Sequence, residues 1–209
     1  GSIDIQSNIV SDRKVKILTS ASKKKKKVTS TNSDIIIQST QNRVETENLT
    51  AGNSVQLDAG LNGAENSSWD ILVKAPIIAN KLQTNPSPDV HGNILLRAAG
   101  NISTKTVRSD GGLGAQSAKS GGIQIEAWKN GGAATEFVIG GPGINGVDGI
   151  LSSKSTVGGG TNPAFVNGGV NITNGGTASS GGISVLDPAK IQVRASESRS
   201  GTIILNAQF

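Results

Sequence analysis

Few residues in this chain are of a type suited to chemistry, and the most conspicuous are lysines. Lys23, Lys24, Lys25, Lys26 and Lys27 form an unbroken run in a chain of formal net charge +5, so without the run the balance is 5 − 5 = 0. The basic character is therefore one local feature, and it predicts no specific nucleic-acid partner. We interpret the run as a candidate binding loop for surface glycans or other anionic polymers; the simpler interpretation is a solvated loop.

No spacing typical of a catalytic or metal centre is visible. The chain has no cysteine, and His91 is its only histidine, which argues against a transition-metal site or a catalytic triad. The segment 140–149 partly matches the Gly-Gly-x-Gly-x-Asp calcium repeat, but Asn145 stands at the carboxylate position, so turns are favoured over a calcium site. We expect no catalytic, cofactor-binding or metal-binding residue, and no cofactor.

Two tryptophans stand beside strand-like segments. Trp128 follows such a segment and is a candidate exposed aromatic residue that would stack on a sugar; packing at a corner of the fold is the favoured alternative. Trp69 has the same parity as Ile71, so it is expected to point inward or to pack at a corner.

A recurring phrase defines the elements that must position these residues: a small or polar residue, an aliphatic, any residue, and a second aliphatic. Its alternation predicts strands with one buried face. A second aliphatic group follows several phrases, so strand, turn and strand make one coil of a β-helix. The expected core ladder is Ile3, Ile5, Ile35, Ile37, Val55, Leu57, Ile71, Val73, Ile94, Leu96, Ile123, Ile125, Ile203 and Leu205.

The spacing of the phrases predicts an all-β fold, a right-handed parallel β-helix (solenoid) of roughly nine coils. Val170 and Ile183 are too close for separate coils, so their phrases are expected to be two faces of one coil. Residues 1–209 are expected to be a single β-helix segment excerpted from a longer chain. Within it we expect a Lys-rich inserted loop at 19–33 and Gly-rich loops at 108–122 and 140–169.

Outward positions follow from the same alignment. Lys74, Arg97 and Glu126 each lie three residues after the first aliphatic of a phrase, so they are predicted to form one external row. Attraction is expected between Arg97 and Glu126, and repulsion between Lys74 and Arg97. A glycan-cleaving β-helix would need several acids on such a face, and this row contains one.

Residues 92–102 read Gly-Asn-Ile-Leu-Leu-Arg-Ala-Ala-Gly-Asn-Ile, a phrase that resembles the filamentous haemagglutinin-like exoproteins of bacterial two-partner secretion. Segments 55–59 and 202–207 repeat it in part, and the Ser/Gly-rich stretch 109–123 looks like connections in such proteins. The resemblance covers most of the chain. It implies secretion through an outer-membrane partner and a role as a surface fibre or adhesin.

We therefore expect a structural or adhesive segment of a secreted bacterial surface fibre, located outside the cell, and not an enzyme. Both ends fall within strand phrases, so the expected partners are flanking coils or a second copy stacked end to end. No apolar run reaches the roughly 18 residues of a membrane span. The alternative is a glycan-binding or polysaccharide-degrading β-helix protein. A face binding ice or crystalline glycan is disfavoured because the outward residues are irregular.

Overall fold

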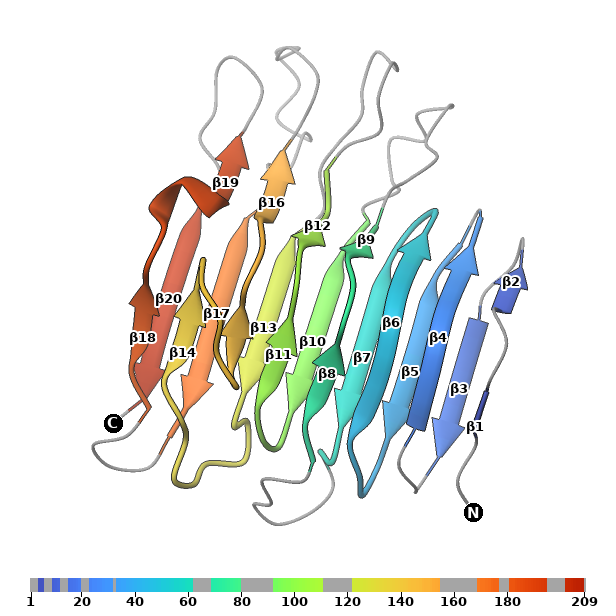
Figure 1. The fold of residues 1–209 in the computed structure, drawn as a ribbon, viewed down its shortest axis with the longest axis horizontal. Helices are drawn as coiled ribbons and strands as arrows, with labels where there is room; N and C mark the ends of the chain where they lie inside the picture. Colours follow the sequence, from blue (N-terminus) through green and yellow to red (C-terminus); the bar gives the residue numbers. More distant parts are fainter. Residues whose placement is uncertain are drawn as a thin grey trace.

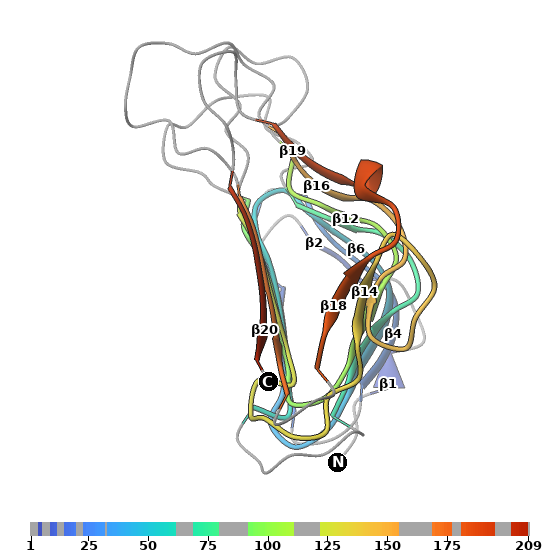
Figure 2. The ribbon, with the colours of Figure 1, turned by 90° about the vertical axis from the view of Figure 1, so that its left-hand side faces the viewer.

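Parallel β-structure dominates the computed structural model of the chain (Figure 1). The structure describes residues 4–5, 9–11, 15–19, 23–31, 33–61, 69–79, 92–110, 122–154, 169–176, 181–194 and 202–208. Every strand pair within these ranges is parallel. The strands form two curled sheets that face each other (Figure 2), so the all-β prediction is confirmed and the architecture is consistent with a β-helix or solenoid.

One sheet has seven strands, one for each successive coil. Valine and isoleucine start these strands, and both favour a pleated, half-buried surface. The first residues align without slippage, since Ile35 lies opposite Val55 and Val55 lies opposite Ile94. The strands are β3 (Val15–Thr19), β5 (Ile35–Ser39), β7 (Val55–Ala59), β10 (Ile94–Ala98), β13 (Ile123–Ala127), β17 (Val170–Gly175) and β20 (Ile203–Gln208).

The other sheet has thirteen strands. Within it β6 is long enough to pair with β8 through Val44 and with β9 through Leu49, and a bend at 74–76 separates β8 from β9. The strands are β1 (Asp4–Ile5), β2 (Ile9–Ser11), β4 (Lys23–Ser30), β6 (Val44–Ala51), β8 (Ile71–Val73), β9 (Ile77–Ile78), β11 (Ile102–Thr104), β12 (Val107–Arg108), β14 (Phe137–Ile139), β15 (Gly146–Val147), β16 (Leu151–Lys154), β18 (Ile183–Val185) and β19 (Ile191–Arg194); a 3-10 turn (Pro188–Lys190) precedes β19.

The hydrophobic core fills the space between the two sheets. Ten residues of the expected ladder are at most 2% exposed: Ile35, Ile37, Val55, Leu57, Ile71, Val73, Ile94, Leu96, Ile123 and Ile125. Ile203 and Leu205 align with the buried Val170 and Ile172, as the ladder predicts, but they are 47% and 39% exposed. The reason is that β20 has a neighbouring strand, β17, on one side only. Ile3 and the side chain of Ile5 lie outside the described residues.

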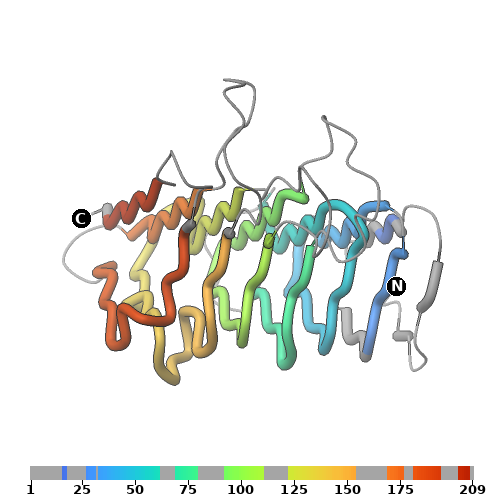
Figure 3. Tube along the Cα trace, turned by 90° about the horizontal axis from the view of Figure 1, so that it is seen from above, coloured from blue at the N-terminus to red at the C-terminus, as the bar shows by residue number. Residues whose placement is uncertain are grey.

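The expected number of about nine coils is not confirmed. Three of the nine phrases, those of Ile5, Ile71 and Ile183, lie in the thirteen-stranded sheet and so share coils with strands of the other sheet. The prediction that Val170 and Ile183 occupy two faces of one coil is confirmed, since β17 and β18 lie in different sheets. Figure 3 shows the coils following one another along the long axis.

Two predicted loops contain strands instead. The expected loop at 19–33 contains β4, because Val28 is buried opposite Leu49 and its register extends back through the lysines. The expected loop at 140–169 contains β15 and β16, whose Val147 and Leu151 are fully buried, while residues 155–168 lie outside the described ranges. Of the third loop, 108–122, residues 111–121 are not described.

One coil contributes an extra strand. After β13 the chain forms β14, returns through residues 140–145, and forms β15 between β14 and β11. Gly146 has φ +147°, and a Cβ atom there would lie 1.9 Å from the Val138 carbonyl oxygen. Only glycine permits this approach of the two strands. The returning segment therefore projects from the regular stack of coils.

Candidate functional site

The lysine run lies in the thirteen-stranded sheet. The backbone of β4 aligns Lys23 with Val44, Lys24 with Glu45 and Lys27 with Asn48. The side chain of Lys27 is exposed, and those of residues 23–26 lie outside the described part of the chain. The run is a strand and not the loop that we expected, so any polyanion would meet an extended row of residues rather than a projecting loop.

The predicted external row is correct for two of its three residues. Arg97 and Glu126 are direct neighbours on β10 and β13. Lys74 was placed wrongly, because it follows β8 in the other sheet, where its Nζ donates to Glu45 Oε1 at 2.6 Å. Within the seven-stranded sheet the row is made by residues at the same offset: Gln38, Asp58, Arg97, Glu126, Thr173 and Asn206.

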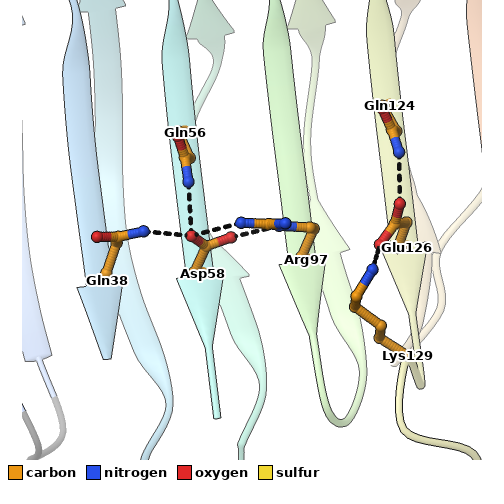
Figure 4. Close-up of polar contacts among 7 residues, drawn as sticks. All are labelled: Gln38, Gln56, Asp58, Arg97, Gln124, Glu126 and Lys129. Atoms are coloured by element: carbon orange, nitrogen blue, oxygen red, sulfur yellow. Dashed lines mark hydrogen bonds and ion pairs between the residues drawn. The ribbon is translucent and has the colours of Figure 1, made fainter. Parts of the chain in front are cut away.

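Asp58 is the centre of this row (Figure 4). Arg97 donates to it twice, from Nε to Oδ1 at 2.7 Å and from Nη2 to Oδ2 at 3.0 Å. Gln38 and Gln56 donate to Oδ2 at 2.5 and 2.7 Å. The carboxylate is only 4% exposed, and both its oxygens are occupied. Asp58 therefore joins β5, β7 and β10 and is poorly suited to act as a base.

The hydrogen-bond network shifts the pKa values of its two charged residues, Asp58 and Arg97. Burial opposes the charge on Asp58, but the hydrogen bonds from Arg97, Gln38 and Gln56, with the positive charge of Arg97, outweigh burial and hold the pKa of Asp58 below its ordinary value. The hydrogen bond to Asp58 raises the pKa of Arg97, against the smaller effect of its own burial. The pair is fully charged at neutral pH.

Glu126 belongs to a separate group, although it stands beside Arg97. Its two oxygens accept hydrogen bonds from Lys129 Nζ and Gln124 Nε2 (Figure 4). The expected attraction between Arg97 and Glu126 is an electrostatic one between the two charges, since the charge of Glu126 contributes to the raised pKa of Arg97. No hydrogen bond between them is present among the described residues.

Trp128 is not an exposed aromatic residue; it is 6% exposed. The strand β13 ends at Ala127, and the φ of +52° at Trp128 turns the chain at the corner. The indole Nε1 donates to Asn101 Oδ1 at 2.9 Å. The alternative of corner packing is therefore correct, and a sugar-stacking role for this ring is excluded because the ring is covered.

Within the glycine-rich segment 140–149, the side chain of Asn145 points inward. Asn145 is fully buried; its Oδ1 accepts from the Ile102 N–H at 2.9 Å, and its Nδ2 donates to the Thr135 carbonyl at 3.0 Å. Asn174, also fully buried, donates to the carbonyls of Thr135, Gly181 and Gly182 at 2.9, 3.0 and 3.1 Å. These amides satisfy backbone groups around the extra strand. Both hydrogen-bonding groups of the Asn145 side chain therefore contact other residues of this chain.

Metal-binding clusters of three or more His, Cys, Asp or Glu side chains are not found in the described ranges. His91 lies outside them. In the same ranges no helix has the length and apolar character needed to cross a membrane.

A recess of about 460 Å³ opens on the thirteen-stranded sheet, beside the extra strand. Arg43, Asp70 and Asn101 each stand immediately before an aligned strand residue, so they form a row on successive coils. The remaining lining residues are Ile71, Leu72, Ser103, Gly143 and Ile144. Burial raises the pKa of Asp70, against the opposing effects of the hydrogen bond from the Asn101 N–H, 2.7 Å long, and the charge of Arg43.

A groove of about 410 Å³ crosses β10, β13, β17 and β20 on the outer face of the other sheet. Its outward side chains are Asn93, Leu95, Gln124, Asn171, Thr202 and Ile204, none of them charged.

Sequence reasoning missed Asp58, Asp70 and Asn174. The sequence did contain a signal for Asp58, because this residue lies three residues after Val55, the same offset that selected Arg97 after Ile94. Asp70 and Asn174 had no comparable signal, since their surroundings depend on which coil each neighbour joins. No protein-family model, curated protein or solved structure matches the chain.

Proposed function

We propose that this chain is a structural or adhesive segment of a secreted bacterial surface fibre, extending as a β-helical rod. The observation that supports it is the unbroken parallel register, in which Ile35, Val55 and Ile94 stack directly on successive coils. A solenoid of this kind grows in one dimension, because each coil contacts only its neighbours. Such a body is suited to spanning distance and presenting loops.

The finer features of the proposal follow from the same architecture. A right-handed coil is favoured by the handedness of crossovers between parallel strands, and the path drawn in Figures 1 and 2 supports it. The phrase at 92–102 supports membership of the filamentous haemagglutinin-like exoproteins and export by two-partner secretion. The exposed residues Ile203 and Leu205 support contact of β20 with a further coil or a second copy.

We further propose that the chain is not an enzyme. Glycoside hydrolysis requires two carboxyl groups flanking the bond to be cleaved. Asp70 is the one acid that lines the recess, and Asp58 on the other sheet is engaged by Arg97 and two glutamines. The absence of turnover on a panel of neutral and acidic polysaccharides is the expected result, and measurable depolymerisation would refute this part.

Immunoelectron microscopy of the source bacterium tests the proposed role directly. Antibodies raised against this chain are expected to label filaments on the outside of intact cells, and deletion of the gene should abolish the label and reduce attachment to surfaces. Label confined to the cytoplasm, or label on cells that carry no filaments, would refute a fibre. The deletion strain is the control for antibody specificity.

A further inference from the structure

The recess on the thirteen-stranded sheet exists because one coil departs from the regular repeat. In the row of strands β18, β14, β15, β11 and β8, a regular stack would take one strand from each coil. However, β14 and β15 come from the same coil. The segment between them contributes Gly143 and Ile144 to the wall of the recess. An insertion that adds a wall beside polar residues is typical of a binding loop carried on a rigid scaffold.

The charged groups at the recess nearly balance. Arg43 Nη2 lies 3.2 Å from Glu45 Oε2, and Lys74 Nζ lies 2.6 Å from Glu45 Oε1. Arg43 and Asp70 are the two charged residues that line the recess, so one positive and one negative side chain face its space. A strongly charged ligand would gain little from such a field, so an uncharged ligand is favoured.

Two of the residues that line the recess keep hydrogen-bonding capacity. Asp70 Oδ1 accepts from the Asn101 N–H, and within the described residues Asp70 Oδ2 has no hydrogen-bond donor. Arg43 contributes one nitrogen to Glu45 and keeps other N–H groups for a ligand. An acceptor beside a donor suits a pair of neighbouring hydroxyls, one donating to the carboxylate and the other accepting from the guanidinium.

Apolar surface faces the same space. Leu72 lies on the outer face of β8, and Ile144 is 71% exposed, the most exposed of the large hydrophobic side chains in the described ranges. Burial of such a side chain against a ligand is favourable, whereas its exposure in the free protein is not. A sugar ring combines these needs, since it carries hydroxyls at its rim and C–H groups on its faces.

We propose that this recess binds an uncharged sugar unit of a glycan, with Asp70 and Arg43 holding adjacent hydroxyls and Ile144 and Leu72 covering the C–H face. The inference rests on the adhesive part of the proposed function and names its ligand class. A volume of about 460 Å³ lies within the usual range for small-ligand sites. A peptide cannot add as a strand here, because β8 and β11 already have neighbours on both sides.

The test is an array of neutral glucose-, galactose- and mannose-based oligosaccharides, followed by titration of the best ligand against the whole chain. Asp70→Asn keeps an acceptor for the Asn101 N–H but removes the charge, and we expect binding to weaken about tenfold or more. Ile144→Ser alters an exposed side chain and should weaken binding several-fold. The matched controls are Glu126→Gln and Ile204→Ser, which make the same changes on the opposite sheet and should leave affinity unaltered.

Three outcomes would refute the proposed sugar site. The proposal fails if no neutral oligosaccharide binds, if only charged glycans or peptides bind, or if the controls weaken binding as much as Asp70→Asn does. Circular dichroism of each variant establishes that the strands are retained. Filament labelling on intact cells distinguishes the two proposals: labelled filaments without glycan binding refute the recess alone, and glycan binding by a chain absent from filaments refutes the fibre alone.

Discussion

Replacing Asp58 by alanine removes the acceptor of four hydrogen bonds that link β5, β7 and β10. Hydrogen bonds to a charged group contribute about 1.5–3 kcal/mol each, but they are not additive within one network. Arg97, whose side chain is 27% exposed, recovers water after the change, so the loss is smaller than for a fully buried unpaired charge. We expect Asp58→Ala to lower the free energy of unfolding by about 2–4 kcal/mol.

Chemical denaturation followed by circular dichroism measures this loss, and thermal unfolding should show a melting temperature lower by roughly 4–16 °C. The control is Glu126→Ala in the same row, whose partners Lys129 and Gln124 are more exposed, and it should cost less than about 1 kcal/mol. A double-mutant cycle with Arg97→Ala isolates the pair. The reasoning is refuted if Asp58→Ala costs no more than Glu126→Ala, or if the cycle gives no coupling.

The same network predicts a pH dependence. Because the pKa of Asp58 is lower in the folded protein than its ordinary value of 3.8, ionised Asp58 stabilises the fold above pH 3.8. That contribution is lost as the pH falls through the lower, folded-state pKa. The stability difference between the wild-type chain and Asp58→Ala should therefore be constant near neutral pH and shrink in acid. A difference that stayed constant down to pH 2 would contradict the assignment.

Three further changes test other features. Gly146→Ala should destabilise the chain by about 3 kcal/mol or more, because its Cβ would meet the Val138 carbonyl, whereas Gly182→Ala, with nothing within 4 Å, should be nearly neutral in the same denaturation assay. Asn174→Leu should cost about 1–3 kcal/mol, because the Gly181 carbonyl loses its donor Asn174 Nδ2, whereas the Thr135 and Gly182 carbonyls keep the donors Asn145 Nδ2 and Phe137 N–H; a stabilising effect would refute the role of that amide. Replacing Lys23–Lys27 by serine should abolish retention on a sulfated-polysaccharide column, and retention that survives the replacement or high salt would exclude electrostatic binding by the run.

The alternation of aliphatic residues was sufficient to predict the all-β class and the central aliphatic ladder of the core. Val55 and Leu57, or Ile94 and Leu96, can bury a common face only as strands, because side chains alternate between the two faces of a strand. The offset from these residues also brought Arg97 beside Glu126. These features depend on local periodicity, which is fully present in the sequence.

Only the tertiary structure decided which sheet each phrase joins. Ile71 and Ile94 have the same pattern, yet they lie in different sheets, because the position of a strand depends on how its coil stacks on the one before. For this reason Lys74 lies in a different sheet from Arg97, the lysine run forms a strand instead of the expected loop, and the ring of Trp128 is covered. The recess formed by Arg43, Asp70 and Ile144 has the same origin: its residues are far apart in the chain and meet only because one coil carries an extra strand.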